Sequence, residues 1–440
     1  MPNSVTPSES LQTASEFDSR IYKRSRTAYI WDCTFEYFVS LLMADSFLAK
    51  LLGNLGFSDS QIGILSSFIS LAFLFQLCAI PVVRNITDTK RFAVLFHTSS
   101  QAVFVFLYLV PFLPIAAAVK KVLVPVCLLA AYFGNYFVTN TIYAWGNSFV
   151  EPKKRGSFQA SKEMVSLISG VVVSFAVGII MDRFDTSGNL YGGFLFSAIA
   201  IAVFSGCDLV CLLLIKNRLR DLPKSDRVPL REVMKNTFGN KNYRHLLLLT
   251  IVYTCGQYAS LGFVGNYKIS ELAFDLTVVQ LINIGGQLAR FAVSKPFGRF
   301  ADKTSYAHCE TLGLIIMAAS FLALALTSPS SRWLIIAYVL LYNMSLAGTN
   351  QNMLMMTYNY VDAKYYAEAT AIKSGLAGFC GFLTSLLCGK LLSYVQTDGL
   401  SVFGINFCGQ QLLGIISLII CLCAIIISKF VVEKQSRIGC

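Results

Sequence analysis

The sequence has little charge for its length. Of its 440 residues, 14% are Asp, Glu, Lys or Arg, against about 25% in soluble globular domains, so an ordinary soluble protein is excluded. No two glycines stand two residues apart, which excludes a GxGxxG loop, and the GxSxG, GKS/T and HExxH patterns are absent. We therefore expect neither an enzyme nor an ATP-driven pump.

The sequence also lacks the residue spacings of metal and disulfide sites. Its 13 cysteines form no CxxC pair and its three histidines are dispersed, so we expect no zinc site, no disulfide framework and no cofactor. Most cysteines stand in apolar runs, where a free thiol acts as a small hydrophobic side chain. Residues 1–16 are polar and contain no signal-peptide core, so the first hydrophobic segment is interpreted as a retained span.

Hydrophobic residues make up 55% of the chain, which is enough for about twelve membrane-spanning helices of 20 residues each. The apolar runs lack the alternation of an outer-membrane barrel, so we predict an all-α integral membrane protein. The predicted spans lie near 27–50, 60–80, 92–113, 122–147, 158–181, 192–215, 246–266, 277–297, 308–327, 333–357, 367–396 and 409–432.

A basic segment divides these spans into two sets of six. Residues 216–245 carry nine Lys or Arg and two prolines, and we interpret them as a linker on one side of the membrane. The predicted organisation is a tail (1–26), a six-helix half (27–215), the linker, a second six-helix half (246–432) and a tail (433–440).

The Lys and Arg residues are distributed unequally between the two membrane sides. With a cytoplasmic N-terminus, 26 fall on the inner side and 6 on the outer side, which by the positive-inside rule places both termini in the cytoplasm of a cell-membrane protein. This bias accounts for the net charge of +12, so no nucleic-acid partner is expected.

The two halves resemble each other at an offset of 211 residues. Lys162 corresponds to Lys373, Gly170 to Gly381, and the segment before each pair has the same pattern of acid and Lys. Parallel repeats of this kind are one of the architectures of secondary transporters, with the binding site between the halves.

Short motifs at two junctions carry a family resemblance. The run Gly298-Arg299-Phe300-Ala301-Asp302-Lys303 resembles the loop motif G-x-x-x-D-[RK] of the major facilitator superfamily, and the run 152–156 resembles its P-x-x-R-G junction. The resemblance implies twelve helices and alternating access, with a cytoplasmic gate formed by Asp88, Pro152, Arg155, Gly298, Asp302 and Lys303.

The sequence departs from the family motif at three positions. In the first half, Arg84 stands where the motif has Gly, and Thr89 stands where it has a basic residue after Asp88. In the second half, Ser305 stands where the motif has its later Gly. The patterns of drug antiporters, peptide carriers and sugar porters are absent, so the subfamily stays open.

Ionisable residues inside the apolar runs are the main candidates for function, because each costs roughly 2.5 to 3.5 kcal/mol at the membrane centre. Asp32 and Glu36 stand one helical turn apart, and Glu36 lies about 14 Å along the first span. Four basic residues also lie within spans: Lys162, Arg290, Lys373 and Lys390. Lys162 and Lys373 could also extend back to the membrane surface.

Polar side chains recur on the helices that line the central cavity in this superfamily. The resemblance therefore implies a cavity site that contains Asn140, Tyr253, Gln257, Asn350 and Gln351 together with Glu36. Hydrogen bonding between helices is the alternative for each of them.

We predict a secondary transporter for a small organic solute, coupled to a proton or another ion and surrounded by membrane lipid. A non-transporting receptor or scaffold on the same fold is the alternative.

The charge bias predicts which loops face the cytoplasm. Single cysteines introduced at Thr304 and Ser225 should react with a membrane-impermeant maleimide only from the inner side, and one at Ser330 only from the outer side. If the cysteine at position 225 were labelled in intact cells, the orientation of the protein would be the reverse of the predicted one.

Overall fold

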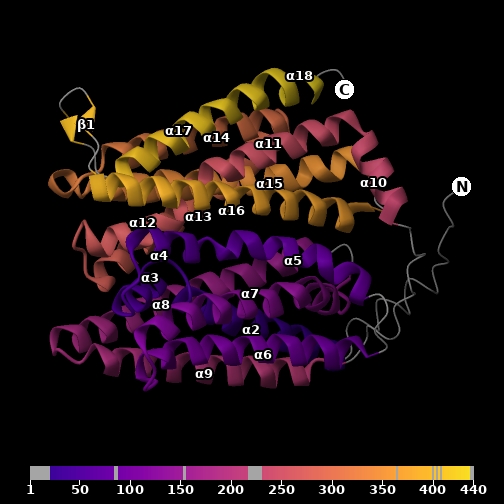
Figure 1. Cartoon of the computed structure of the whole chain (residues 1–440). Helices are drawn as coiled ribbons and strands as arrows, with labels where there is room; N and C mark the ends of the chain where they lie inside the picture. Colours follow the sequence, from indigo (N-terminus) through magenta and orange to yellow (C-terminus); the bar gives the residue numbers. More distant parts are fainter. Residues whose placement is uncertain are drawn as a thin grey trace, which may run out of the picture. The chain divides into compact units, whose positions relative to one another are not determined.

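The computed structural model describes residues 20–83, 88–151, 155–216, 230–362, 365–398, 401–402, 405–406 and 409–436. This part of the chain is built almost entirely from helices (Figure 1). Its two short strands, β1 (Ser401–Val402) and β2 (Ile405–Asn406), form one antiparallel pair. The predicted all-α class is confirmed.

Ten segments of the described chain are long and apolar enough to cross a membrane. Two further long helices, α2 (Arg20–Leu42) and α15 (Leu334–Tyr360), contain more charged or polar residues. Together they correspond to the twelve predicted spans, because every predicted run overlaps one of these segments.

The chain forms two compact units. Unit 1 contains Met1–Met43 and Cys78–Ser225, and unit 2 contains Ala44–Leu77 and Asp226–Cys440. This division differs from the predicted halves in one segment, since residues 44–77 pack with unit 2. The change from unit 1 to unit 2 at residues 225–226 falls inside the predicted linker.

Unit 1 is built around α2, which packs against α8 and α9, while α6 packs against α7 and α9 (Figure 1). Tyr29, Trp145 and Phe149 are fully buried in its core. Besides α2, its helices are α6 (Thr89–Leu109), the 3₁₀ turn η1 (Val110–Phe112), α7 (Ala117–Asn147), α8 (Arg155–Thr186) and α9 (Leu190–Leu214).

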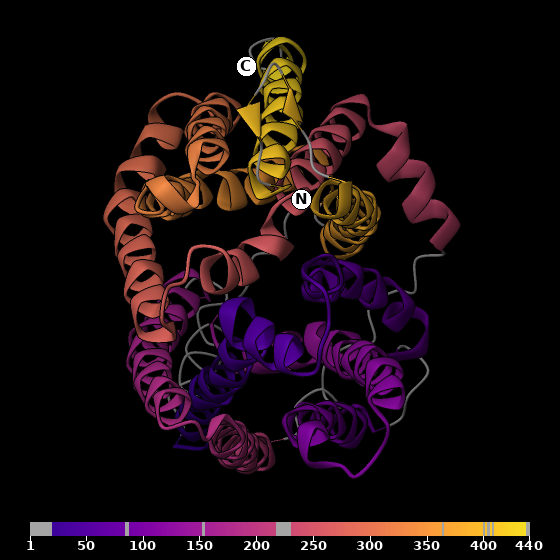
Figure 2. The same ribbon diagram turned by 60° about the vertical axis from the view of Figure 1, so that its left-hand side comes forward.

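Unit 2 contains the remaining helices. Its closest packing joins α15 to α14 and α13, α17 to α14 and α11, and α11 to α16, which Figure 2 shows from a second direction. The short helices α3 and α4 pack against α12. These helices are α3 (Asp45–Asn54), α4 (Asp59–Ser66), α10 (Leu230–Gly239), α11 (Lys241–Tyr258), α12 (Leu261–Ser270), α13 (Leu276–Lys303), α14 (Tyr306–Leu326), η3 (Pro329–Ser331), α15, α16 (Tyr366–Asp398), α17 (Gly409–Ile427), the π-helical turn η5 (Ser428–Val432) and α18 (Glu433–Ser436). The helix α5 (Phe68–Val83) passes from unit 2 to unit 1 at residue 77.

Polar residues at the helix starts explain several boundaries. Ser58 and Gln61 form a reciprocal capping box at α4, and the side chains of Asn189, Asn240 and Ser305 accept backbone N–H groups at α9, α11 and α14. Such caps satisfy N–H groups that have no partner within the helix.

Five predicted segments differ from the structure. The first predicted span is two helices, because the chain breaks after Leu42 and Asp45 adopts a positive φ of 47°. The predicted spans 60–80 and 246–266 are also each two helices, since α4 ends at Ser66 before α5 and α11 ends at Tyr258 before α12. The motif at 298–303 was expected to form a loop but is the last turn of α13, which leaves only Thr304 and Ser305 before α14. Part of the predicted linker is also helical, since α10 and the start of α11 lie within 216–245.

Glycines allow close approach between helices in both units. A Cβ built at Gly146 of α7 would overlap the Tyr29 ring of α2, and one at Gly170 of α8 would overlap the Tyr37 ring. In unit 2, Gly378 of α16 lies against the backbone of Ser70, whose hydroxyl donates to the Gly378 carbonyl oxygen at 2.6 Å. Small residues are typical of such contacts in membranes.

Gly146→Ala should therefore destabilise the protein by roughly 1–3 kcal/mol, because overpacking forces the buried Tyr29 ring to move. Thermal unfolding in detergent would measure the loss. Gly206→Ala is the matched control, since a Cβ at Gly206 of α9 meets nothing within 4 Å. Equal effects of the two substitutions would contradict the close contact.

Candidate functional site

The two acids of α2 lie inside unit 1. Asp32 is 2% exposed, and its Oδ2 has no hydrogen-bond partner among the described residues. Glu36 follows one turn later and is half-buried. The charges of His97, Asp208 and Lys162 act on Glu36, and those of Asp208 and Glu36 act on Asp32. The acids predicted from the sequence therefore face charged groups on three other helices.

A buried ion pair connects α6 to α9. His97 Nε2 lies 2.7 Å from Asp208 Oδ2, and both side chains are about 2% exposed. Gln101, one turn after His97, places its Nε2 3.4 Å from the same ring nitrogen. His97 Nδ1 and Asp208 Oδ1 have no partner in the described part of the chain. Breaking such a pair is costly, because one charge would remain buried without compensation.

Lys162 of α8 is held by aromatic rings. Its Nζ lies 5.0 Å from the centroid of Tyr143 and 5.9 Å from that of Tyr29. A cation over an aromatic face gains about 0.5 to 2 kcal/mol, with the larger values for desolvated pairs. Lys162 is half-buried, so these rings fix its ammonium group near the α2 acids.

These five residues, Asp32, Glu36, His97, Lys162 and Asp208, form what we call the unit 1 acid cluster. With every acid ionised and both basic groups charged, the cluster carries three negative and two positive charges. One bound proton would make it neutral. Because net charge is expensive away from water, the composition of this cluster favours uptake of a proton.

Unit 2 contains a second buried pair of charged residues. Glu310 of α14 is fully buried, and neither of its carboxylate oxygens has a hydrogen-bond partner within the described ranges. The charge of Lys373 acts on Glu310. Lys373 is 5% exposed and donates to the Met353 carbonyl oxygen at 2.8 Å and to Thr357 Oγ1 at 2.7 Å. One acid and one base make this pair neutral without an added proton.

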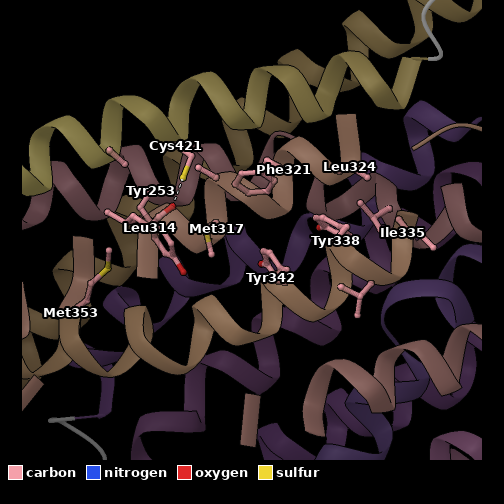
Figure 3. Close-up of a cluster of buried hydrophobic side chains, with 14 of the residues drawn as sticks. Tyr253, Leu314, Met317, Phe321, Leu324, Ile335, Tyr338, Tyr342, Met353 and Cys421 are labelled. Carbon is pink, nitrogen blue, oxygen red and sulfur yellow. Dashed lines mark hydrogen bonds between the residues drawn. The ribbon is translucent and has the colours of Figure 1, made fainter. Parts of the chain in front are cut away.

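Polar side chains of α11 and α15 form a buried network in unit 2. Gln257 Nε2 donates to the hydroxyl oxygens of Tyr253 (2.9 Å) and Tyr342 (3.0 Å), and Tyr253 Oη lies 3.1 Å from Thr349 Oγ1. Figure 3 shows Tyr253 and Tyr342 within the hydrophobic cluster that surrounds this network. Tyr253 and Gln257 therefore stand together on α11, and each of them also forms a hydrogen bond to α15.

A third polar group in unit 2 joins α3, α12 and α13. Lys268 Nζ donates to Asp45 Oδ2 at 2.8 Å and to Asn283 Oδ1 at 3.2 Å, while Asn283 Nδ2 donates to Asp45 Oδ2 at 2.9 Å. The Lys268 side chain is 4% exposed and that of Asp45 is 33% exposed. This arrangement holds the residue with positive φ in place.

Three other predicted cavity residues lie apart from these networks: Asn140 of α7 and both Asn350 and Gln351 of α15 are exposed. Arg290 of α13 is half-buried, and its charge acts on Tyr342 of the buried network. Exposed amides on a helix of a membrane protein can bind water or a polar solute, so these side chains stay candidates for solute contact.

The predicted gate residues have varied positions. Asp88 caps its own helix: its Oδ1 accepts the Arg91 N–H at 3.1 Å, and its Oδ2 lies 3.2 Å from Arg91 Nε. Gly298 lies inside α13, and Lys303 is its exposed last residue. Pro152 lies outside the described residues, as do the side chains of Arg155 and Asp302.

Three ionisable residues of these sites were missed in the sequence analysis: His97, Asp208 and Glu310. Each lies within a predicted apolar span, as Glu36 does, so the same criterion would have selected them. The network residues Tyr342, Thr349 and Asn283 were also not selected. His97 was set aside because the histidines are distant in sequence, yet its partner Asp208 is 111 residues away.

The sequence matches the Major Facilitator Superfamily over residues 31–389. The chain belongs to this superfamily of transporters. The match extends through both units and includes the unit 1 acid cluster. Among curated proteins, no sequence matches the chain significantly.

Solved structures of other superfamily members are similar in fold. A variant of the nucleoside transporter NupG aligns with a TM-score of 0.70 at 11% identity, covering 91% of this chain and 98% of that chain. The D-xylose-proton symporter aligns with a TM-score of 0.68 at 14% identity, covering 95% and 99%. A bacterial homologue of the iron transporter ferroportin, inward-facing, gives 0.66 at 14% identity, covering 93% and 98%. At these identities the similarity establishes the fold alone.

The Asp45–Lys268 pair can be tested by a double-mutant cycle. Lys268→Met and Asp45→Asn should each lower stability, and the double variant should lose less than the sum, with a coupling energy of about 1 kcal/mol because the two side chains share one network. Thermal unfolding in detergent would measure it. Additive losses would contradict a direct contact between the two side chains.

Proposed function

We propose that this transporter moves a small polar organic solute by alternating access and is coupled to protons through the unit 1 acid cluster. The observation that carries the proposal is the excess of one acid over the basic groups in that cluster. The Glu310–Lys373 pair in unit 2 is already neutral. A bound proton therefore neutralises an excess charge in the unit 1 acid cluster, whereas it would create one at this pair.

Glu36 is the proposed site of proton exchange. It is the half-buried acid of the cluster, whereas Asp32 and Asp208 are almost fully buried. A coupling acid must gain and lose its proton as access changes, so it needs both contact with water and neighbours whose charge stabilises it. His97 and Lys162 are positively charged neighbours that could stabilise the ionised form.

Hydrogen-bonding side chains support a polar solute. Asn140, Asn350 and Gln351 are exposed within their units, and amides can both donate and accept hydrogen bonds. Two similar structures are those of a nucleoside transporter and a D-xylose-proton symporter, which supports a hydroxyl-bearing solute and proton coupling here. We further propose residence in a cell membrane with both termini in the cytoplasm, on the basis of the charge bias.

The proposal predicts a specific defect for Glu36→Gln, which has nearly the same size and imitates the protonated acid. In proteoliposomes, the variant should lose accumulation driven by a pH difference while it keeps solute exchange at equal pH. The solute would first be chosen by thermal-shift screening of nucleosides and monosaccharides, because a ligand that binds the folded state raises its stability.

Glu163→Gln is the matched control, since Glu163 is an exposed acid next to Lys162 on α8. It should leave both activities unchanged. If Glu36→Gln still concentrates solute in response to a pH difference, then the proton binds elsewhere or coupling is absent.

A further inference from the structure

A groove outside the acid cluster runs between the beginning of α6 and the end of α9, which lie side by side (Figure 1). Its volume is about 680 Å³. The lining residues of α6 stand at spacings of three and four and so share one helical face. The groove is lined by Asp88, Lys90, Arg91, Val94, Leu95, Thr98, Leu209 and Leu213.

The walls of the groove are apolar and open to the surroundings of the protein. Leu95 is 65% exposed and Leu213 is 58% exposed. In a membrane protein such side chains contact the hydrocarbon part of the bilayer. The volume of the groove therefore suits an acyl chain lying along the two helices.

The charged residues gather at one end of the groove. Lys90 Nζ donates to the carbonyl oxygens of Leu213 (3.1 Å) and Ile215 (2.5 Å) at the end of α9, so the position of its charge is fixed. The Arg91 side chain is 90% exposed, and its contact with Asp88 involves Nε. A guanidinium group has four further N–H donors, which can bind a phosphate in a bidentate manner.

The charges at this end favour an anion. Lys90 and Arg91 carry two positive charges, and Asp88 neutralises one of them. A phospholipid with a neutral headgroup brings its own cation, which Lys90 and Arg91 would repel, whereas an anionic phospholipid has no such penalty. Basic pockets between helices near a membrane surface are known to bind anionic headgroups.

We infer that this groove binds one anionic phospholipid, with its phosphate at Arg91 and one acyl chain between Leu95 and Leu213. The site is independent of the proposed proton coupling, because Asp88, Lys90 and Arg91 are not part of the unit 1 acid cluster. Its ligand is a bilayer component and not the transported solute.

Tryptophan fluorescence offers a direct test. Lys90 Nζ lies 5.2 Å from the ring centroid of Trp145, which is fully buried beside the groove. The other two tryptophans, Trp31 and Trp333, are exposed, so Trp31→Phe with Trp333→Phe leaves Trp145 as the reporter. The protein would be placed in nanodiscs with phosphatidylglycerol or phosphatidylcholine, each brominated on one acyl chain.

Phosphatidylglycerol should reach half-maximal quenching of Trp145 at a mole fraction roughly three- to ten-fold lower than phosphatidylcholine, which corresponds to about 0.7–1.4 kcal/mol. Arg91→Gln should remove this difference, whereas Arg183→Gln, an exposed arginine of α8 far along the chain, should preserve it. Equal quenching by the two lipids, or a preference that survives in Arg91→Gln, would overturn the inference. The comparison of the two lipids is made on protein that retains Arg91. It therefore tests the inference even if the Arg91→Gln variant does not fold.

Discussion

Charge inside an apolar medium is the constraint on which this structure depends. Each ionised group placed among the helices needs an opposite charge, a hydrogen bond or a proton. Unit 1 meets this need with three acids, a histidine and a lysine held between aromatic rings, and is left with one negative charge in excess. Unit 2 meets it with two balanced pairs, Glu310 with Lys373 and Asp45 with Lys268, and with a neutral network of Tyr, Gln and Thr. The proposed division of labour between the two units follows from this difference.

The internal repeat places equivalent residues in different environments. Helices α8 and α16 begin at Arg155 and Tyr366, an offset of 211 residues, so Lys162 and Lys373 occupy the same helical position. Yet Lys162 faces two tyrosine rings, whereas Lys373 is bound by a carbonyl and a hydroxyl oxygen. Equivalent positions of the sequence repeat therefore have different charge surroundings, which is consistent with the different tasks proposed for the two units.

Hydropathy and charge were sufficient to predict the helical class and the approximate position of each span, because the cost of burying polar groups controls both. They also selected Asp32 and Glu36. They could not reveal that Asp208 pairs with His97, since pairing depends on which helices touch. Likewise Asn350 and Asn352 are neighbouring amides in one polar run, but helix rotation exposes the first and buries the second. The break at Asp45 was not predicted, although Asp tolerates a positive φ better than most residues, because its contacts with Lys268 and Asn283 depend on which helices touch.

The packing of residues 44–77 with unit 2 has a consequence for biosynthesis. The chain leaves unit 1 after Met43 and returns to it at Cys78, while the rest of unit 2 begins at Asp226. At a synthesis rate of about 5 to 20 residues per second, α3, α4 and the first part of α5 are made roughly 10 to 40 seconds before α12 and roughly 15 to 65 seconds before α16. During that interval Gly63, Ser67 and Ser70 have none of their unit 2 partners on those two helices. The insertion machinery or neighbouring lipid must therefore cover a polar, glycine-containing surface that the finished protein buries.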